Sequence, residues 1–133
     1  MSDYGDQVSI LLYSDNANTR RAVMEAVGAR PGKGLPGVNW VEAATADGAV
    51  MAFDSRPIDA LVFDGEAQKV GGMALLRRLN VEYDEVPPSL VLIARQQDEW
   101  LAQFAGTKTV VAWPLDPIAI QEAVASLVRS IRR

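Results

Sequence analysis

The chain has 133 residues, with 13 Lys and Arg, 17 Asp and Glu, and neither His nor Cys. The absence of Cys excludes disulfides and thiolate chemistry, and the absence of His excludes a His triad and nearly all zinc and haem sites. A net charge of −4 argues against a nucleic-acid binder. Since no apolar run approaches the roughly 20 residues of a membrane span, no membrane insertion is expected. We therefore expect a globular, cytoplasmic protein.

Five short apolar runs alternate with helical patterns along the chain. The runs predict strands at residues 9–13, 38–41, 60–63, 90–94 and 109–112. Nearly continuous apolar runs of this length are typical of parallel strands that are covered on both faces. The sequence therefore predicts an α/β fold: a doubly wound, five-stranded parallel sheet in the order 2-1-3-4-5, which is a flavodoxin-like topology.

Helical periodicity fills the intervals between the predicted strands. The helices are expected at residues 17–27, 72–80 and 97–104, and after Asp47 and Asp116. Asp47 is a candidate cap for the second helix, because its carboxylate can accept from the free N–H groups of a first turn. Asp116 is expected to cap the last helix, with Pro117 at its first position.

Polar and charged residues gather where the predicted strands end. In an open parallel sheet, ligands bind beyond the carboxyl ends of the strands, near the change in strand order. The residues that the sequence places there are Ser14, Asp15, Asp64, Glu66, Ala94, Arg95 and Trp113. Asp15 and Asp64 repel each other, so the pair needs a divalent cation such as Mg²⁺, a basic partner or a shared proton.

This arrangement resembles the receiver domain of bacterial response regulators of the chemotaxis-regulator type, over roughly residues 8–131. Asp64 matches the phosphoacceptor that ends the third strand of that family. Gly72 matches the glycine that opens the third helix, Ala94 lies at the position of the switch Ser or Thr, and Pro114 matches the proline that follows a lysine. The resemblance implies a two-component system protein that takes part in phosphorelay signal transduction.

Four positions depart from the pattern of that family, namely Ser14, Ala94, Val110 and Trp113. They stand where the resemblance implies, in that order, an acid, a hydroxyl, an aromatic switch residue and a lysine. In the family the lysine pairs with a phosphoryl oxygen and the hydroxyl hydrogen-bonds to the phosphoryl group. Trp113 and Ala94 can do neither, so we expect the pocket to have lost its signalling chemistry.

The metal site that the resemblance implies is expected to be weak or lost. Its remaining ligands would be Asp15, Asp64 and the backbone carbonyl of Glu66, a sparse set for Mg²⁺, and no other cofactor is expected. Without a metal, Asp64 is expected to share a proton with Asp15 or to pair with Arg95 at the pocket rim. Trp113 is expected either to cover the pocket as an apolar lid or simply to pack before the following proline.

These features predict an atypical, stand-alone receiver that acts as a protein-interaction module, independent of phosphorylation and without enzymatic activity. Residues 1–7 are expected to be a flexible amino terminus, and residues 8–133 a single domain with no output domain. The alternative is a conventional receiver that a histidine kinase phosphorylates at Asp64. A flavodoxin-like protein that binds FMN is a remote alternative, because it would share the topology.

The expected partner face consists of the fourth helix, the fifth strand and the fifth helix. Trp100, Trp113, Glu122 and Arg129 are the residues expected on it, and the same face would support a homodimer. Trp100 and Phe104 are also open to a second interpretation as core side chains, which is the commoner role of aromatic residues. The partner is expected to be a protein, with a histidine kinase as one candidate, and not a nucleic acid.

Overall fold

A five-stranded parallel sheet forms the centre of the computed structural model, which describes residues 7–107 and 109–131. The strands are β1 (Gln7–Tyr13), β2 (Gly37–Ala43), β3 (Ala60–Asp64), β4 (Ser89–Ile93) and β5 (Thr109–Ala112). They are ordered β2-β1-β3-β4-β5, which confirms the predicted fold class and strand order.

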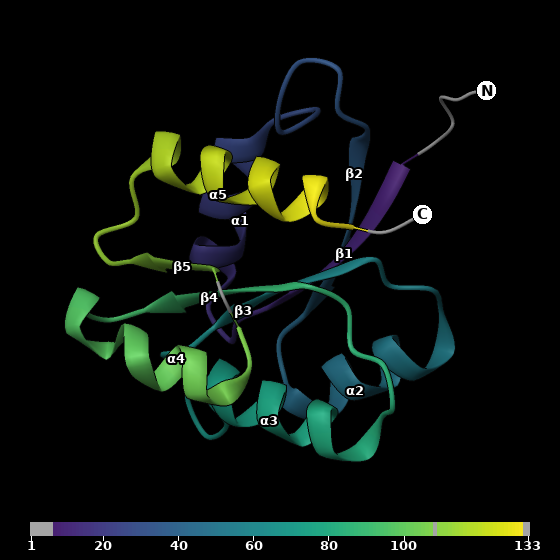
Figure 1. Ribbon diagram of the computed structural model, residues 1–133, viewed down its shortest axis with the longest axis vertical. Coiled ribbons are helices and arrows are strands. Elements are labelled where there is room, and N and C mark those ends of the chain that lie inside the picture. The colour runs from purple at the N-terminus through teal and green to yellow at the C-terminus, as the bar shows by residue number, and fades with distance from the viewer. Residues whose placement is uncertain (1–6, 108, 132–133) are drawn as a thin grey trace.

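The connections between the strands are helical and cover both faces of the sheet. The helices are α1 (Ala17–Val27), α2 (Ala46–Ser55), α3 (Gly72–Glu82), α4 (Glu99–Ala105) and α5 (Pro117–Arg129), with a short 3₁₀ helix η1 (Gln96–Asp98) before α4. Figure 1 shows α1 and α5 on one face and α2, α3 and α4 on the other. This is the doubly wound arrangement that right-handed crossovers produce.

Two apolar clusters, one on each face of the sheet, hold the layers together. Successive strand residues point to opposite faces, so Leu11 and Phe63 pack under α2–α4 while Ile10 and Val62 pack under α1 and α5. Every residue of β3 and β4 is buried. That burial on both faces explains the apolar runs at residues 60–63 of β3 and 90–93 of β4.

Two helix starts show where capping was predicted correctly and where it was not. The Asp116 carboxylate accepts a hydrogen bond from the Ala119 N–H at 3.0 Å, with Pro117 first in α5, as expected. The prediction of Asp47 as a cap was wrong, because the Thr45 hydroxyl accepts from the Gly48 N–H at 2.9 Å. Asp47 instead lies in the first turn of α2, where a negative charge suits the helix dipole.

The short helix α4 turns its aromatic side chains outward. Trp100 is 65% exposed and Phe104 is 76% exposed, so the interpretation of these two residues as core was wrong. The inward positions are taken by Ala102 and Ala105, which are buried against the sheet and α3. A seven-residue helix has only one narrow inner face, and small residues already fill it.

At the amino end, β1 begins at Gln7, which pairs with Gly37 and so lies within the sheet. The remainder of the predicted flexible terminus, residues 1–6, lies outside the described residues. In the described part of the chain, none of the helices has the length and apolar character that crossing a bilayer requires.

Candidate functional site

The loops that follow β1, β3 and β5 meet at the carboxyl edge of the sheet, where they form a pocket of about 440 Å³. The strand register brings these loops together, because Tyr13 lies beside Phe63 and Ile93 beside Ala112. We call this site the acidic pocket; its lining residues are Asp15, Asn16, Ala17, Thr19, Asp64, Glu66, Gln68 and Trp113. The structure therefore brings together the two aspartates, the glutamate and the tryptophan that the sequence placed at the strand ends.

Asp64 is the buried centre of the acidic pocket, with 4% of its surface exposed. Its Oδ2 accepts a hydrogen bond from the Ser14 hydroxyl at 2.8 Å, and its Oδ1 accepts one from the Glu66 N–H at 2.8 Å. Ser14 is fully buried, and its Oγ also accepts from the Asn16 N–H at 3.1 Å. Ser14, which stands at the position of an acid, therefore holds the carboxylate of Asp64 as a donor instead of repelling it.

Asp15 ties the loop after β1 to the loop after β3, because its Oδ2 accepts from the Gln68 N–H at 3.1 Å. The carboxylates of Asp15 and Asp64 thus already accept protein hydrogen bonds on three of their four oxygens. In the described part of the chain, no group of three or more acidic side chains is placed to hold a metal ion. Two engaged carboxylates and the Glu66 carbonyl fit Mg²⁺ poorly, since that ion requires near-ideal octahedral geometry.

Two of the departing positions, Ala94 and Trp113, follow the ends of neighbouring strands. Ala94 directly follows β4 and brings no hydroxyl to this edge. The Trp113 N–H donates to the Ile93 carbonyl at 2.9 Å, which continues the ladder between β4 and β5. The indole of Trp113 is 38% exposed and forms a wall of the acidic pocket, so an apolar ring stands where the family has a cation. Val110 lies within β5, partly buried against the α2–α4 cluster.

Arg95 takes no part in the acidic pocket. Its Nη2 forms an ion pair with Asp98 Oδ1 at 3.2 Å, and its side chain is 65% exposed. The expected pairing of Arg95 with Asp64 is therefore not found. Asp98 competes successfully because it is three residues away in η1, whereas Asp64 is already held by Ser14 and Glu66.

Sequence reasoning missed Tyr13, which borders the site from the end of β1. The Tyr13 hydroxyl donates to the Val70 carbonyl at 2.5 Å, and its ring meets Phe63 edge-on with centroids 6.0 Å apart. Burial, and then the nearby charges of Asp15 and Asp64, raise the pKa of Tyr13. Its position next to Ser14 at a strand end was the only signal available in the sequence.

Arg20 was also missed. Its Nε donates to Glu42 Oε1 at 2.9 Å and its Nη1 donates to the Ser14 carbonyl at 2.6 Å. These bonds join α1 to β2 and fix the backbone of the loop after β1. Nothing in helical periodicity distinguishes this arginine from its neighbour Arg21, which among the described residues bonds only to the Asn18 side chain.

The residues expected on the partner face are exposed but spread along the molecule. Trp113 lies at the carboxyl edge of the sheet, whereas Arg129 ends α5 near the opposite edge and its Nη2 approaches Gly32. Trp100 lies on α4, and Glu122 shares the exposed side of α5 with Ile118. The structure thus separates Arg129 from Trp113.

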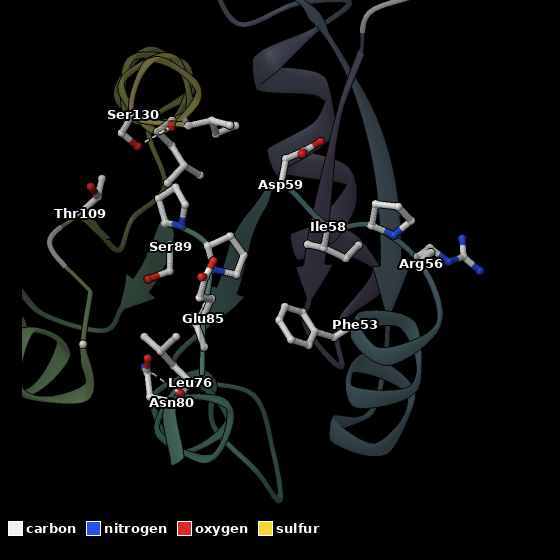
Figure 2. A pocket seen from close by; sticks show the side chains of 17 residues that line it. Phe53, Arg56, Ile58, Asp59, Leu76, Asn80, Glu85, Ser89, Thr109 and Ser130 are labelled. Carbon is white, nitrogen blue, oxygen red and sulfur yellow. Dashed lines mark hydrogen bonds between the residues drawn. The ribbon is translucent and has the colours of Figure 1, made fainter. Parts of the chain in front are cut away.

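A larger cavity, of about 810 Å³, opens at the other end of the sheet. Figure 2 shows Ile58 and Asp59 where β3 begins, Ser89 at the start of β4, and Ser130 beyond α5. This is the amino edge of the strands, where an open parallel sheet does not normally bind its ligand. Size alone therefore does not make it the functional site.

The comparisons with known proteins agree with this geometry. No family model matches the chain. An uncharacterised response regulatory protein of Mycobacterium tuberculosis, found in strains H37Rv and CDC 1551, is 40% identical over 130 residues, which cover 98% of each chain. The match therefore includes both the site and the whole sheet.

Solved structures give the same fold at much lower identity. A chemotaxis response regulator of Vibrio cholerae superimposes with a TM-score of 0.77 at 15% identity, covering 92% of this chain and 99% of that one. A Francisella response regulator receiver domain gives a TM-score of 0.76 at 15% identity, with coverage of 92% and 98%. The chain belongs to the response regulator receiver family, whose members are signalling modules of two-component systems.

Proposed function

We propose that this chain is an atypical receiver that signals by binding a protein partner, without phosphorylation of Asp64 and without enzymatic activity, in the bacterial cytoplasm. The observation that carries the proposal is the indole of Trp113 in the wall of the acidic pocket. Because the chain belongs to the receiver family, the alternative of a flavodoxin-like protein that binds FMN is not favoured.

The charge of the acidic pocket supports this function. Phosphoryl transfer to Asp64 would add negative charge beside Asp15 and Glu66, and such transfers depend on cations placed where that charge develops. The lining residues include three acids and neither Lys nor Arg. The negative charge of the acidic pocket therefore opposes phosphoryl transfer to Asp64.

The read-out of a phosphoryl group is also missing. A switch needs two states that make different contacts with the ligand. Ala94 has no hydroxyl to move toward a phosphoryl oxygen, and both oxygens of Asp64 already accept hydrogen bonds from Ser14 and Glu66. These contacts favour one fixed conformation of the pocket.

Exposed apolar side chains beside the edge strand β5 support a protein partner. Trp100 and Phe104 project from α4, and Ile118 from the start of α5 is 65% exposed. The guanidinium of Arg77 lies 5.9 Å from the Phe104 ring centroid. Exposed aromatic and arginine side chains are typical of protein interfaces. We propose a histidine kinase or a second copy of the chain as the partner that binds this surface.

The direct test is incubation of the purified protein with acetyl phosphate, or with beryllium fluoride, in the presence of Mg²⁺. We expect neither a mass increase nor an NMR shift at Asp64. A variant with Ser14→Asp, Ala94→Thr and Trp113→Lys restores the family residues and serves as the matched control. An adduct on the unmodified protein would refute the proposal and establish the conventional receiver.

A second experiment addresses the partner. Proteins that co-purify from the native cell are compared between unmodified, Asp64→Ala and Trp100→Ala baits, and sedimentation measures self-association of each. We expect Asp64→Ala to retain the partners and Trp100→Ala to lose them. Loss of a partner on Asp64→Ala alone would show that the carboxylate still gates binding.

A further inference from the structure

The acidic pocket carries negative charge that nothing in the described structure neutralises. Asp15, Asp64 and Glu66 all line it, and none of the ion pairs formed between described residues includes any of the three. The buried carboxylate of Asp64 already accepts two hydrogen bonds, whereas the exposed carboxylates of Asp15 and Glu66 keep oxygens that accept none from the described residues. The charge therefore favours a positively charged occupant.

Thr19 supplies a second, independent observation. It lies in the first turns of α1, lines the acidic pocket and is 5% exposed. Its hydroxyl forms no hydrogen bond with any described residue, although buried hydroxyls are normally paired. An occupant with N–H donors would bond to this hydroxyl directly, whereas a hydrated metal ion would reach it only through its water molecules.

Trp113 decides which kind of cation suits the pocket. An indole face attracts organic cations, and guanidinium groups stack on it most readily. A guanidinium also presents five N–H donors in one plane, so it can serve carboxylate oxygens and a hydroxyl together. Mg²⁺ gains nothing from an aromatic wall and meets carboxylates that are already engaged.

We infer that the acidic pocket binds the guanidinium group of an arginine side chain of a protein partner, through the exposed carboxylates of Asp15 and Glu66, the Thr19 hydroxyl and the Trp113 indole. The inference deepens the proposed function and rests on it in one respect, namely that the arginine belongs to another protein. A free guanidine compound has the same recognition chemistry, so the experiment has to distinguish these two sources.

The probe is N-acetyl-arginine methyl ester, titrated into the whole chain and followed by the indole N–H and amide resonances in ¹H–¹⁵N NMR spectra. We expect saturable shifts at Trp113, Thr19 and Gln68. The citrulline analogue has the same shape without the charge, and it should bind roughly tenfold more weakly, since a charged hydrogen bond is about twice as strong as a neutral one. Equal binding of the two esters, or no saturable shift, would overturn the inference.

Three variants locate the effect. Trp113→Leu and Glu66→Gln alter side chains that reach the surface, so both proteins are expected to fold, and each should weaken binding of the arginine ester several-fold. Glu25→Gln removes an exposed carboxylate of α1 outside the pocket and should leave the affinity unchanged. If Glu25→Gln weakened binding as much as Glu66→Gln, the site would lie elsewhere and the inference would fail.

A ten-residue peptide with one central arginine separates the two sources. Tighter binding of this peptide than of the ester supports a protein partner, and tighter binding of the free ester overturns that part of the inference. The phosphorylation assay on the same sample keeps the two proposals apart. Failure of the arginine titration without a beryllium fluoride adduct would overturn only the inference, whereas an adduct would overturn the proposed function whatever the titration gives.

Discussion

Replacing Ser14 with Ala tests the central hydrogen bond of the acidic pocket. The substitution removes the O–H donor to Asp64 Oδ2, and both residues are almost completely shielded from water. A hydrogen bond to a charged group contributes roughly 1.5–3 kcal/mol, so we expect the free energy of unfolding to fall by about 2–3 kcal/mol. The Asn16 N–H also loses its acceptor, but Asn16 is exposed and water can replace it at little cost.

The assay is urea denaturation at neutral pH, with a double-mutant cycle to isolate the pair. Ser14→Ala should lower the transition midpoint without changing the slope. In the background of Asp64→Ala the same change should cost less than about 1 kcal/mol, because the acceptor is already gone. Ser55→Ala, at the exposed end of α2, serves as the control and should change stability by less than about 0.5 kcal/mol. Equal costs of Ser14→Ala in the two backgrounds would refute the argument.

Three further predictions concern neighbouring features. Burial raises the pKa of Tyr13, so its neutral form favours folding. This contribution to stability is complete below about pH 10 and disappears as the pH rises through the raised pKa. In urea denaturation, Tyr13→Phe should therefore flatten the decline of the unfolding free energy at alkaline pH. Gly72→Ala would place a Cβ 2.8 Å from the Asp64 carbonyl oxygen and should destabilise by about 1–3 kcal/mol in the same assay, whereas no destabilisation would contradict the close packing of α3 on β3. Titration with millimolar Mg²⁺ should leave the fluorescence of Trp113 unchanged, since the carboxylates are engaged, and a saturable change would establish a metal site.

The fold could be predicted from the sequence because burial on two faces leaves a simple pattern. Strand β3 is apolar at every position before Asp64, and the amphipathic period of α1 predicted its bounds at Ala17 and Val27 correctly. Capping was harder to predict at α2, since Thr45 and Asp47 both suit a helix start. Only the extended backbone at Thr45 decides between them.

The residues that line the site could be predicted from the sequence better than the contacts that they make. Strand ends indicated that Asp15, Asp64 and Trp113 would meet, since parallel strands end at one edge. The bond from the Gln68 N–H to Asp15 joins residues 53 positions apart, and no local pattern encodes it. The pairing of Arg95 was mispredicted because a nearby acid, Asp98, was left out of account.

The loop between β3 and α3 is fastened to the end of β1 at two points. The Gln68 N–H donates to Asp15, and the Val70 carbonyl accepts from the Tyr13 hydroxyl. These two hydrogen bonds restrict movement of the segment relative to the sheet, so a partner that binds as proposed would meet this edge in the shape described here. Evolution can then tune recognition here by changing side chains alone, without having to preserve a moving part.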